Sequence, residues 1–214
     1  MKKTILAIAL VSSVSFSANA EFIETDWLAD GDKSATFDNE SGLEWLDLNI
    51  TRGMSLTEAK SQLDGGTLDG WRLPTEDELL QLVINLFPSA SSPYGGWTNI
   101  SAEDNLFYRN TFVSGDTAAY SYGMFQHDNG QISFMGTYHS GLLAGFGFAK
   151  GVHSEAGRGD SGIWLVSEGG TTLSSINDPT LGGYRATASV PLPATSLLLL
   201  TSAFLMRNRR RKDK

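Results

Sequence analysis

Three histidines and the serine of a Gly-Asp-Ser-Gly stretch are the residues whose types could support nucleophilic catalysis. His127, His139 and His153 all precede Ser161, the serine of the stretch at residues 159–162. A serine nucleophile needs a histidine base and an acid held in a defined geometry around it, so residue types alone do not make a triad. No histidine lies in a recognisable triad context, and the sequence therefore predicts no catalytic residue.

The same histidines could instead bind a transition metal together with carboxylate side chains. The nearby acidic residues are Asp128, Glu155 and Asp160. No local spacing such as His-Glu-x-x-His gathers these ligands, so no metal ligand is predicted. A metal-dependent hydrolase is accordingly the least favoured of three functional hypotheses.

The acidic segment at residues 30–40 and the lack of cysteine bear on cofactors. Counted from Asp30, the segment has neither the glycine at position 6 nor the glutamate at position 12 of an EF-hand. A calcium site of another type on the acidic surface stays open as an alternative, and otherwise no cofactor is expected. The absence of cysteine excludes disulfides and thiolate ligands.

Aromatic residues are the best candidates for binding, because their rings offer flat apolar surfaces with a polar edge. We expect such stacking surfaces at Tyr94, Trp97, Tyr120 and Tyr122. Residues 21–206 contain 8 of the 16 Lys and Arg but 23 of the 24 Asp and Glu, a net charge of about −15. Nucleic acid, which requires a basic surface, is therefore excluded as a partner.

Two helices and a hairpin in the first half of the chain are the clearest elements. The segments 35–38 and 43–48 flank the turn-forming residues Asn-Glu-Ser-Gly and predict an antiparallel hairpin. Ser55 with Glu58 and Thr75 with Glu78 fit the capping box of a helix start. The apolar residues expected to face the core are Leu56, Ala59 and Leu63 in the first helix and Leu79, Leu80, Val83, Ile84 and Phe87 in the second.

Short alternating segments follow Pro88 and indicate strands. Residues 118–126, 131–139 and 162–167 alternate polar and apolar side chains, with an Asp-Asn-Gly turn between the first two. These segments predict an antiparallel sheet, so the fold class is α+β in one domain, residues 21–167. Residues 168–189 are expected to be a linker, with an edge strand at 184–187 as an alternative.

The N-terminal 20 residues have the pattern of a secretory signal peptide. Two lysines precede an apolar stretch, and Ala18 and Ala20 form an Ala-x-Ala cleavage site, so the exported chain should begin at Glu21. The C-terminal residues 195–206 form a second apolar run, about 18 Å long as a helix and marginal for a bilayer core of about 30 Å. Basic residues after it should remain cytoplasmic; they are Arg207, Arg209, Arg210, Arg211, Lys212 and Lys214.

The C-terminal region 190–214 as a whole resembles the PEP-CTERM sorting signal in its VPLPA variant. The motif is Val190, Pro191, Leu192, Pro193 and Ala194, followed by the apolar helix and the basic end. Leu192 replaces the glutamate of the commoner form. The resemblance implies recognition by an exosortase, a membrane-embedded processing enzyme of Gram-negative bacteria that export exopolysaccharide. It also implies a transient anchor in the inner membrane.

The ectodomain resembles the DUF1566 or Lcl C-terminal family. The residues that carry the resemblance are Gly42, Leu43 and Trp45, then Trp71, Arg72, Leu73, Pro74 and Thr75, and finally Trp164. It implies a fold like that of C-type lectins or formylglycine-generating enzymes. Formylglycine-generating chemistry is excluded, because those enzymes use cysteines and this chain has none.

Arg72 is the charged exception among the apolar residues of this motif. A guanidinium in apolar surroundings needs a carboxylate or carbonyl partner, and we expect Glu44 or Asp47 to supply it in a structural role.

These observations predict an exported cell-surface or matrix protein that is not an enzyme. The favoured hypothesis is a binding module for exopolysaccharide or a surface protein. A structural matrix constituent without a specific ligand is the alternative.

Overall fold

The computed structural model describes residues 21–88, 90, 95–113, 120–140, 143–149, 161–178 and 180–181. These residues all belong to one unit, Asn19–Tyr184. Several predicted features lie outside the described residues: the signal peptide with Ala18 and Ala20, the edge strand at 184–187, the sorting signal at 190–214, and Tyr94, His153, Glu155 and Asp160.

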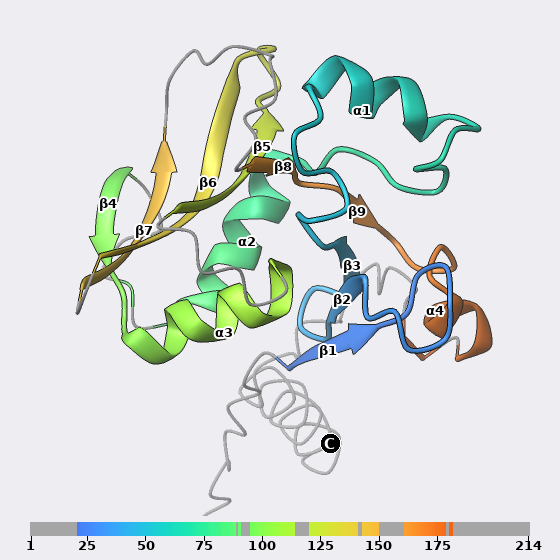
Figure 1. Ribbon diagram of the computed structural model, residues 1–214, viewed down its shortest axis with the longest axis horizontal. Helices are drawn as coiled ribbons and strands as arrows, with labels where there is room; N and C mark the ends of the chain where they lie inside the picture. The colour runs from blue at the N-terminus through green and yellow to red at the C-terminus, as the bar shows by residue number, and fades with distance from the viewer. Residues whose placement is uncertain are drawn as a thin grey trace, which may run out of the picture. The chain divides into compact units, whose positions relative to one another are not determined.

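The first sheet contains four antiparallel strands in the order β1-β2-β3-β9 (Figure 1). They are β1 (Phe22–Thr25), β2 (Ala35–Asp38), β3 (Leu43–Leu46) and β9 (Val166–Ser167). The β2–β3 hairpin confirms the sequence prediction. Gly42 lies in its turn with a φ of 75°, a conformation that glycine adopts without a steric penalty.

The second sheet contains five strands in the order β4-β7-β6-β5-β8. They are β4 (Gly95–Asn99), β7 (Leu143–Ala149), β6 (Ile132–Ser140), β5 (Tyr120–Gln126) and β8 (Ser161–Ile163). All pairs are antiparallel except β5 with β8, which is parallel. The fold is therefore α+β as predicted, but the expected purely antiparallel sheet is corrected at its edge.

Residues 162–167 were expected to form one strand, whereas the structure divides the run Ser161–Ser167 between the two sheets. The short strand β8 pairs with β5, and β9 pairs with β3. Trp164 and Leu165 lie between these strands and are completely buried. Alternation in a sequence indicates extended structure but not the strand with which each residue pairs, so the division between two sheets could not be predicted.

Helices α1 (Leu56–Leu63) and α2 (Glu76–Leu86) begin as predicted. The hydroxyls of Ser55 and Thr75 each accept a hydrogen bond from the amide of the third helical residue, which is a glutamate in both helices. The carboxylate of that glutamate in turn accepts a hydrogen bond from the backbone amide of the cap residue. The buried face of α2 is formed by Leu79, Leu82, Val83 and Leu86. Ile84 is 47% exposed, which corrects its expected place in the core.

Two further helices were not predicted. Helix α3 (Ala102–Phe112) begins at the cap residue Ser101, and the short helix α4 (Leu173–Asn177) begins at Thr172. Helix α3 mixes buried polar and aromatic side chains with exposed Leu106 and Phe107, so its apolar residues do not follow a helical period. Helix α4 lies in the segment expected to be a linker, so the ordered domain continues beyond Ser167.

The core consists of two hydrophobic clusters on opposite faces of the sheets. The first cluster joins α2 and α3 to Trp45, Phe125, Met135 and Trp164. The second cluster joins α1 and Trp71 to the neighbouring positions Leu46, Met124 and Phe134. Consecutive strand residues enter different clusters because side chains alternate across a sheet. Figure 1 accordingly shows α1 apart from α2 and α3.

The tryptophans that carry the sequence resemblance are central to both clusters. The rings of Trp45 and Trp164 meet edge to face with centroids 5.9 Å apart in the first cluster. Trp71 meets Trp27 in the same way at 5.9 Å in the second cluster. These residues therefore contribute packing rather than exposed chemistry.

Candidate functional site

Three tyrosines of the second sheet form a group that we call the tyrosine platform. It consists of Tyr120 and Tyr122 on β5 and Tyr138 on β6. The ring centroids of Tyr120 and Tyr122 are 5.5 Å apart, and those of Tyr120 and Tyr138 are 6.5 Å apart. Both ring pairs are tilted by only 35°. Tyr120 is 47% exposed and the other two are half-buried, so the rings offer one shared surface.

Strand register explains how the platform forms. Tyr120 and Tyr122 are two residues apart on β5 and therefore point to the same face. Tyr138 lies directly opposite Tyr120 in the antiparallel β5–β6 pair. The ring of Tyr122 also contacts Phe134 edge to face, which links the platform to the second core cluster.

A glycine on the neighbouring strand leaves space for the ring of Tyr138. Gly145 of β7 lies opposite Tyr138 in the β6–β7 pair. A Cβ atom added to Gly145 would lie only 2.0 Å from Cε1 of Tyr138, so the tyrosine ring lies over that glycine. A side chain at position 145 would force the ring to move.

The strands that carry the platform contain few ionisable side chains, of which His139 on β6 is one. The sequences of β5, β6 and β7 contain no Asp, Glu, Lys or Arg. Its chemistry is therefore that of aromatic faces with phenolic hydroxyl groups, which suits a ligand with both apolar and hydroxylated surfaces.

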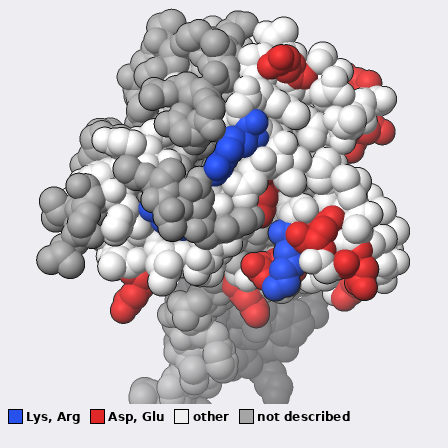
Figure 2. All heavy atoms as spheres, viewed as in Figure 1, with Lys and Arg blue, Asp and Glu red and all other residues white. Residues whose placement is uncertain are grey.

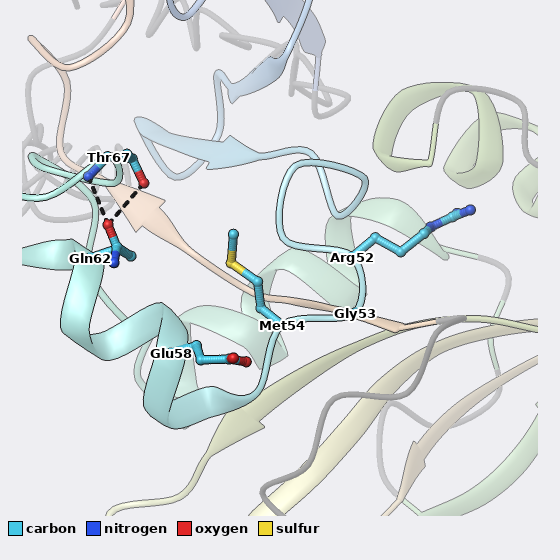
Figure 3. A pocket seen from close by; sticks show the side chains of 6 residues that line it. All are labelled: Arg52, Gly53, Met54, Glu58, Gln62 and Thr67. Carbon is cyan, nitrogen blue, oxygen red and sulfur yellow. Dashed lines mark hydrogen bonds between the residues drawn. The ribbon is translucent and has the colours of Figure 1, made fainter.

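A pocket of about 420 Å³ lies beside α1 (Figure 3). Its lining comes from the loop before α1, from α1 itself and from the loop after it: Arg52, Gly53, Met54, Glu58, Gln62 and Thr67. The amide oxygen of Gln62 accepts hydrogen bonds of 3.2 Å from both the backbone amide and the hydroxyl of Thr67. The pocket thus combines hydrogen-bonding groups with the apolar side chain of Met54.

The capping box of α1 holds Glu58 in the pocket lining. Its Oε2 atom accepts hydrogen bonds from the backbone amide of Ser55 at 2.7 Å and from the Ser55 hydroxyl at 2.8 Å. These bonds, the backbone one first, lower the pKa of Glu58, so this carboxylate is ionised at neutral pH.

The pocket and the tyrosine platform are neighbours through β8. The amide of Gly53 donates a 2.9 Å hydrogen bond to the carbonyl of Ser161. Ser161 in turn pairs with Tyr122 across β8 and β5. Met54 and Tyr122 both pack against the second core cluster, so both lie on the same face of the sheet.

The four aromatic residues predicted to bind a ligand do not lie together in one place. The structure brings Tyr120 and Tyr122 together and adds Tyr138, which the sequence analysis missed. Counting the hairpin back from the Asp-Asn-Gly turn would have placed Tyr138 opposite Tyr120. Trp97 belongs to β4, which is separated from β5 by β7 and β6. Tyr94 lies outside the described residues.

The histidines are not gathered into one site among the residues that the structure describes. Nδ1 of His127 lies 2.7 Å from Oε2 of Glu76, and its Nε2 lies 2.7 Å from Oγ of Ser133. The order Glu76–His127–Ser133 is that of a catalytic triad, but Ser133 is completely buried and cannot contact a substrate. His139 is exposed near the other end of β6, roughly 25 Å away by strand geometry.

Within the described ranges, no group of three or more His, Asp or Glu side chains is arranged to hold a metal ion. The acidic turn after β1 uses its carboxylates internally. Asp32 accepts hydrogen bonds from the backbone amides of residues 27, 28, 29 and 34. Burial acts to raise the pKa of Asp32, but these bonds outweigh it and lower the pKa to about 2. Figure 2 shows a group of acidic side chains at the lower right, where Figure 1 places the loop between β1 and β2, and others over α1.

Asp47 is a buried carboxyl that the sequence analysis did not single out for its own chemistry. It is 3% exposed, and its Oδ1 atom finds no hydrogen-bond partner among the described residues. Burial, with the nearby charges of Glu24 and Asp32, raises its pKa to about 8. At neutral pH this side chain is therefore mostly protonated.

Arg72 binds carboxylates other than those expected. Its guanidinium donates to both oxygens of Glu78, at 2.6 and 2.9 Å, and also to Glu168 at 3.3 Å. The expected partners Glu44 and Asp47 are corrected. Glu44 lies within β3 and Asp47 directly after it, whereas Glu78 is in the first turn of α2, six residues after Arg72.

Glu44 instead holds the segment around α4 against the first sheet. The hydroxyls of Thr172 and Ser175 donate to its two carboxylate oxygens in a buried site. Burial raises the pKa of Glu44, although both hydroxyl bonds act in the opposite direction. The amide of Leu173 also donates to the carbonyl of Trp27. We call this set of contacts the α4 clasp.

In the part of the chain that the structure describes, no helix combines the length and apolar character that a bilayer crossing demands. Comparisons with known proteins found no matching family model, no matching curated protein and no matching solved structure.

Proposed function

We propose that this protein is exported to the cell surface or extracellular matrix, where its domain binds an extracellular polysaccharide. The observation that carries the proposal is the tyrosine platform. Three neighbouring rings, one of them 47% exposed, lie on strands without Asp, Glu, Lys or Arg. Such rings stack against the apolar faces of sugars, while their hydroxyls can hydrogen-bond to sugar hydroxyls.

The export and sorting part of the proposal is supported by the two ends of the sequence. The signal-peptide pattern at 1–20 supports secretion, and the VPLPA motif with its apolar and basic segments supports processing by an exosortase. The location would be the surface or matrix of a Gram-negative bacterium, after a transient stage in the inner membrane.

The family part of the proposal is a DUF1566-like domain with a fold like that of C-type lectins. Its support is that the motif residues have consistent structural roles. Trp45 and Trp164 meet in the core, Pro74 is buried before α2, and Thr75 caps that helix.

Binding is tested with exopolysaccharide purified from the producing cells, using titration calorimetry on the domain. We expect saturable binding that falls about tenfold or more in Tyr120→Ala and Tyr138→Ala. Phe107→Ala is the matched control, because it removes an aromatic ring that is 42% exposed on α3, away from the platform. Equal binding by all variants would place the ligand elsewhere, and no binding by the wild type would favour a structural matrix role.

Sorting is tested separately by intact mass and cell fractionation in the native host. We expect a mature chain that begins at Glu21 and ends near residue 193, and that is lost in Pro193→Ala. A chain that still extends to Lys214 in the inner membrane would contradict the sorting signal without affecting the binding test.

A further inference from the structure

We propose that the tyrosine platform and the pocket beside α1 form one elongated site for an uncharged polysaccharide chain. This inference rests on the proposed function and adds to it a ligand class and a second subsite. The platform would stack one part of the chain, and the pocket would hold sugar units further along it.

The continuity of the two regions is the first argument. Tyr122 pairs with Ser161 on the adjacent strand, and the carbonyl of Ser161 accepts a hydrogen bond from Gly53 at the edge of the pocket. Neighbouring strands lie about 4.8 Å apart, so the path from Tyr122 to Gly53 covers roughly 10 Å. This span exceeds a single sugar ring, and a polymer could therefore contact both regions.

Apolar side chains in both regions are the second argument. Tyr122 of the platform and Met54 of the pocket both pack against the second core cluster from its margin. Aromatic and thioether side chains provide the apolar contacts that the faces of sugar rings need. Both regions thus offer such contacts on one face of the sheet.

The polar lining of the pocket suits hydroxyl groups. Beyond the hydrogen bonds between them, Gln62 retains its amide NH2 as a donor and Thr67 its hydroxyl oxygen as an acceptor, while Arg52 donates and Glu58 accepts. A sugar hydroxyl both donates and accepts, so each of these side chains can pair with it. Figure 3 shows Gln62 and Thr67 facing each other, Met54 and Glu58 nearby, and the Arg52 side chain extending to the opposite side.

The charge of the combined site indicates an uncharged ligand. The pocket lining contains one cation, Arg52, and one anion, Glu58, so its formal charges cancel. The strands β5, β6 and β7 add no Asp, Glu, Lys or Arg. An anionic polymer would also be repelled by the acidic exported chain, whose net charge is about −15.

The test uses fragments of the purified exopolysaccharide, produced by partial acid hydrolysis and separated by length. For the wild type we expect affinity to rise with fragment length and then reach a plateau. Arg52→Ala and Gln62→Ala should weaken the binding of long fragments about tenfold and leave the shortest bound fragments unchanged. Tyr120→Ala should weaken the binding of both. Ser61→Ala is the matched control, since it is exposed on α1 and does not line the pocket.

Three outcomes separate this inference from the proposed function. Affinity that does not depend on length, or pocket variants that bind long fragments normally, would overturn the elongated site and leave the platform intact. A loss of affinity in about 1 M NaCl, where the Debye length is about 3 Å, would overturn the assignment of an uncharged ligand. No binding by any fragment or by the intact polysaccharide would overturn the proposed function itself.

Discussion

The ring of Tyr138 lies over Gly145, so that a Cβ atom at position 145 would approach its Cε1 atom to 2.0 Å. This relationship predicts that Gly145→Ala displaces the ring and lowers polysaccharide affinity about tenfold, although no platform residue is changed. A double-mutant cycle measured by calorimetry tests it. In the Tyr138→Ala background, Gly145→Ala should have no further effect on binding. Additive losses would show that the glycine acts through something other than this ring.

The α4 clasp depends on hydroxyl donors to a buried carboxylate. Thr172→Val removes a hydrogen bond to Glu44 and the cap of α4, and should lower the free energy of unfolding by about 1–3 kcal/mol. Hydrogen exchange should become faster in residues 171–178. Thr180→Val is the control, because its hydroxyl bonds only the exposed Asp178 in the described structure. Unchanged exchange in Thr172→Val would mean that the clasp does not hold this segment.

Asp47 predicts a loss of stability as pH rises. Its pKa of about 8 in the folded protein lies above the ordinary value of 3.8. The folded state therefore retains a proton that the unfolded state releases, and the free energy of unfolding falls between about pH 4 and pH 8. Asp47→Asn should flatten this dependence and stabilise the protein at pH 8 by on the order of 2 kcal/mol.

Urea unfolding at a series of pH values measures the Asp47 effect. Glu40→Gln, at an exposed position, is the control and should retain the wild-type slope. If Asp47→Asn retained the wild-type slope as well, another group would be responsible for the pH dependence.

The pairing of Arg72 with Glu78 depends on the planar guanidinium. Arg72→Lys keeps the charge but cannot contact both carboxylate oxygens at once, so we expect a loss of about 1 kcal/mol in chemical denaturation. Lys33→Ala breaks the Lys33–Glu24 pair, whose side chains are 63% and 45% exposed, and should leave the free energy of unfolding nearly unchanged because solvent screens the pair. Equal losses of unfolding free energy in Arg72→Lys and Lys33→Ala would show that contact with both carboxylate oxygens adds no stability beyond that of an exposed ion pair.

Local signals in the sequence were sufficient for the elements that local chemistry determines. Ser55 and Thr75 identified two helix starts because a capping box is complete within four residues. The hairpin was identified in the same way, because its turn residues stand directly before Leu43 and form a signal that is complete within the turn. Helix α3 was missed because its buried face contains Asn105, Arg109 and Thr111, which do not produce an apolar period.

Features that depend on distant partners could not be predicted in the same way. The parallel pairing of β8 with β5 joins residues about 40 positions apart. Glu44 and Thr172 are separated by 128 positions, and nothing near either residue indicates the other. The platform was half predicted: Tyr120 and Tyr122 were named as candidate stacking surfaces, but Tyr138 required the register of the hairpin, and the pocket required the fold itself.

The run Ser161–Ser167 has a consequence for how the protein comes apart. Its first residues are a strand of one sheet and its last residues a strand of the other, with buried Trp164 and Leu165 between them. Neither sheet can open fully without removing a strand from its neighbour, so both should melt in a single cooperative transition. Cleavage of these two sheets by a protease should therefore follow the unfolding of the whole domain rather than a half-open form.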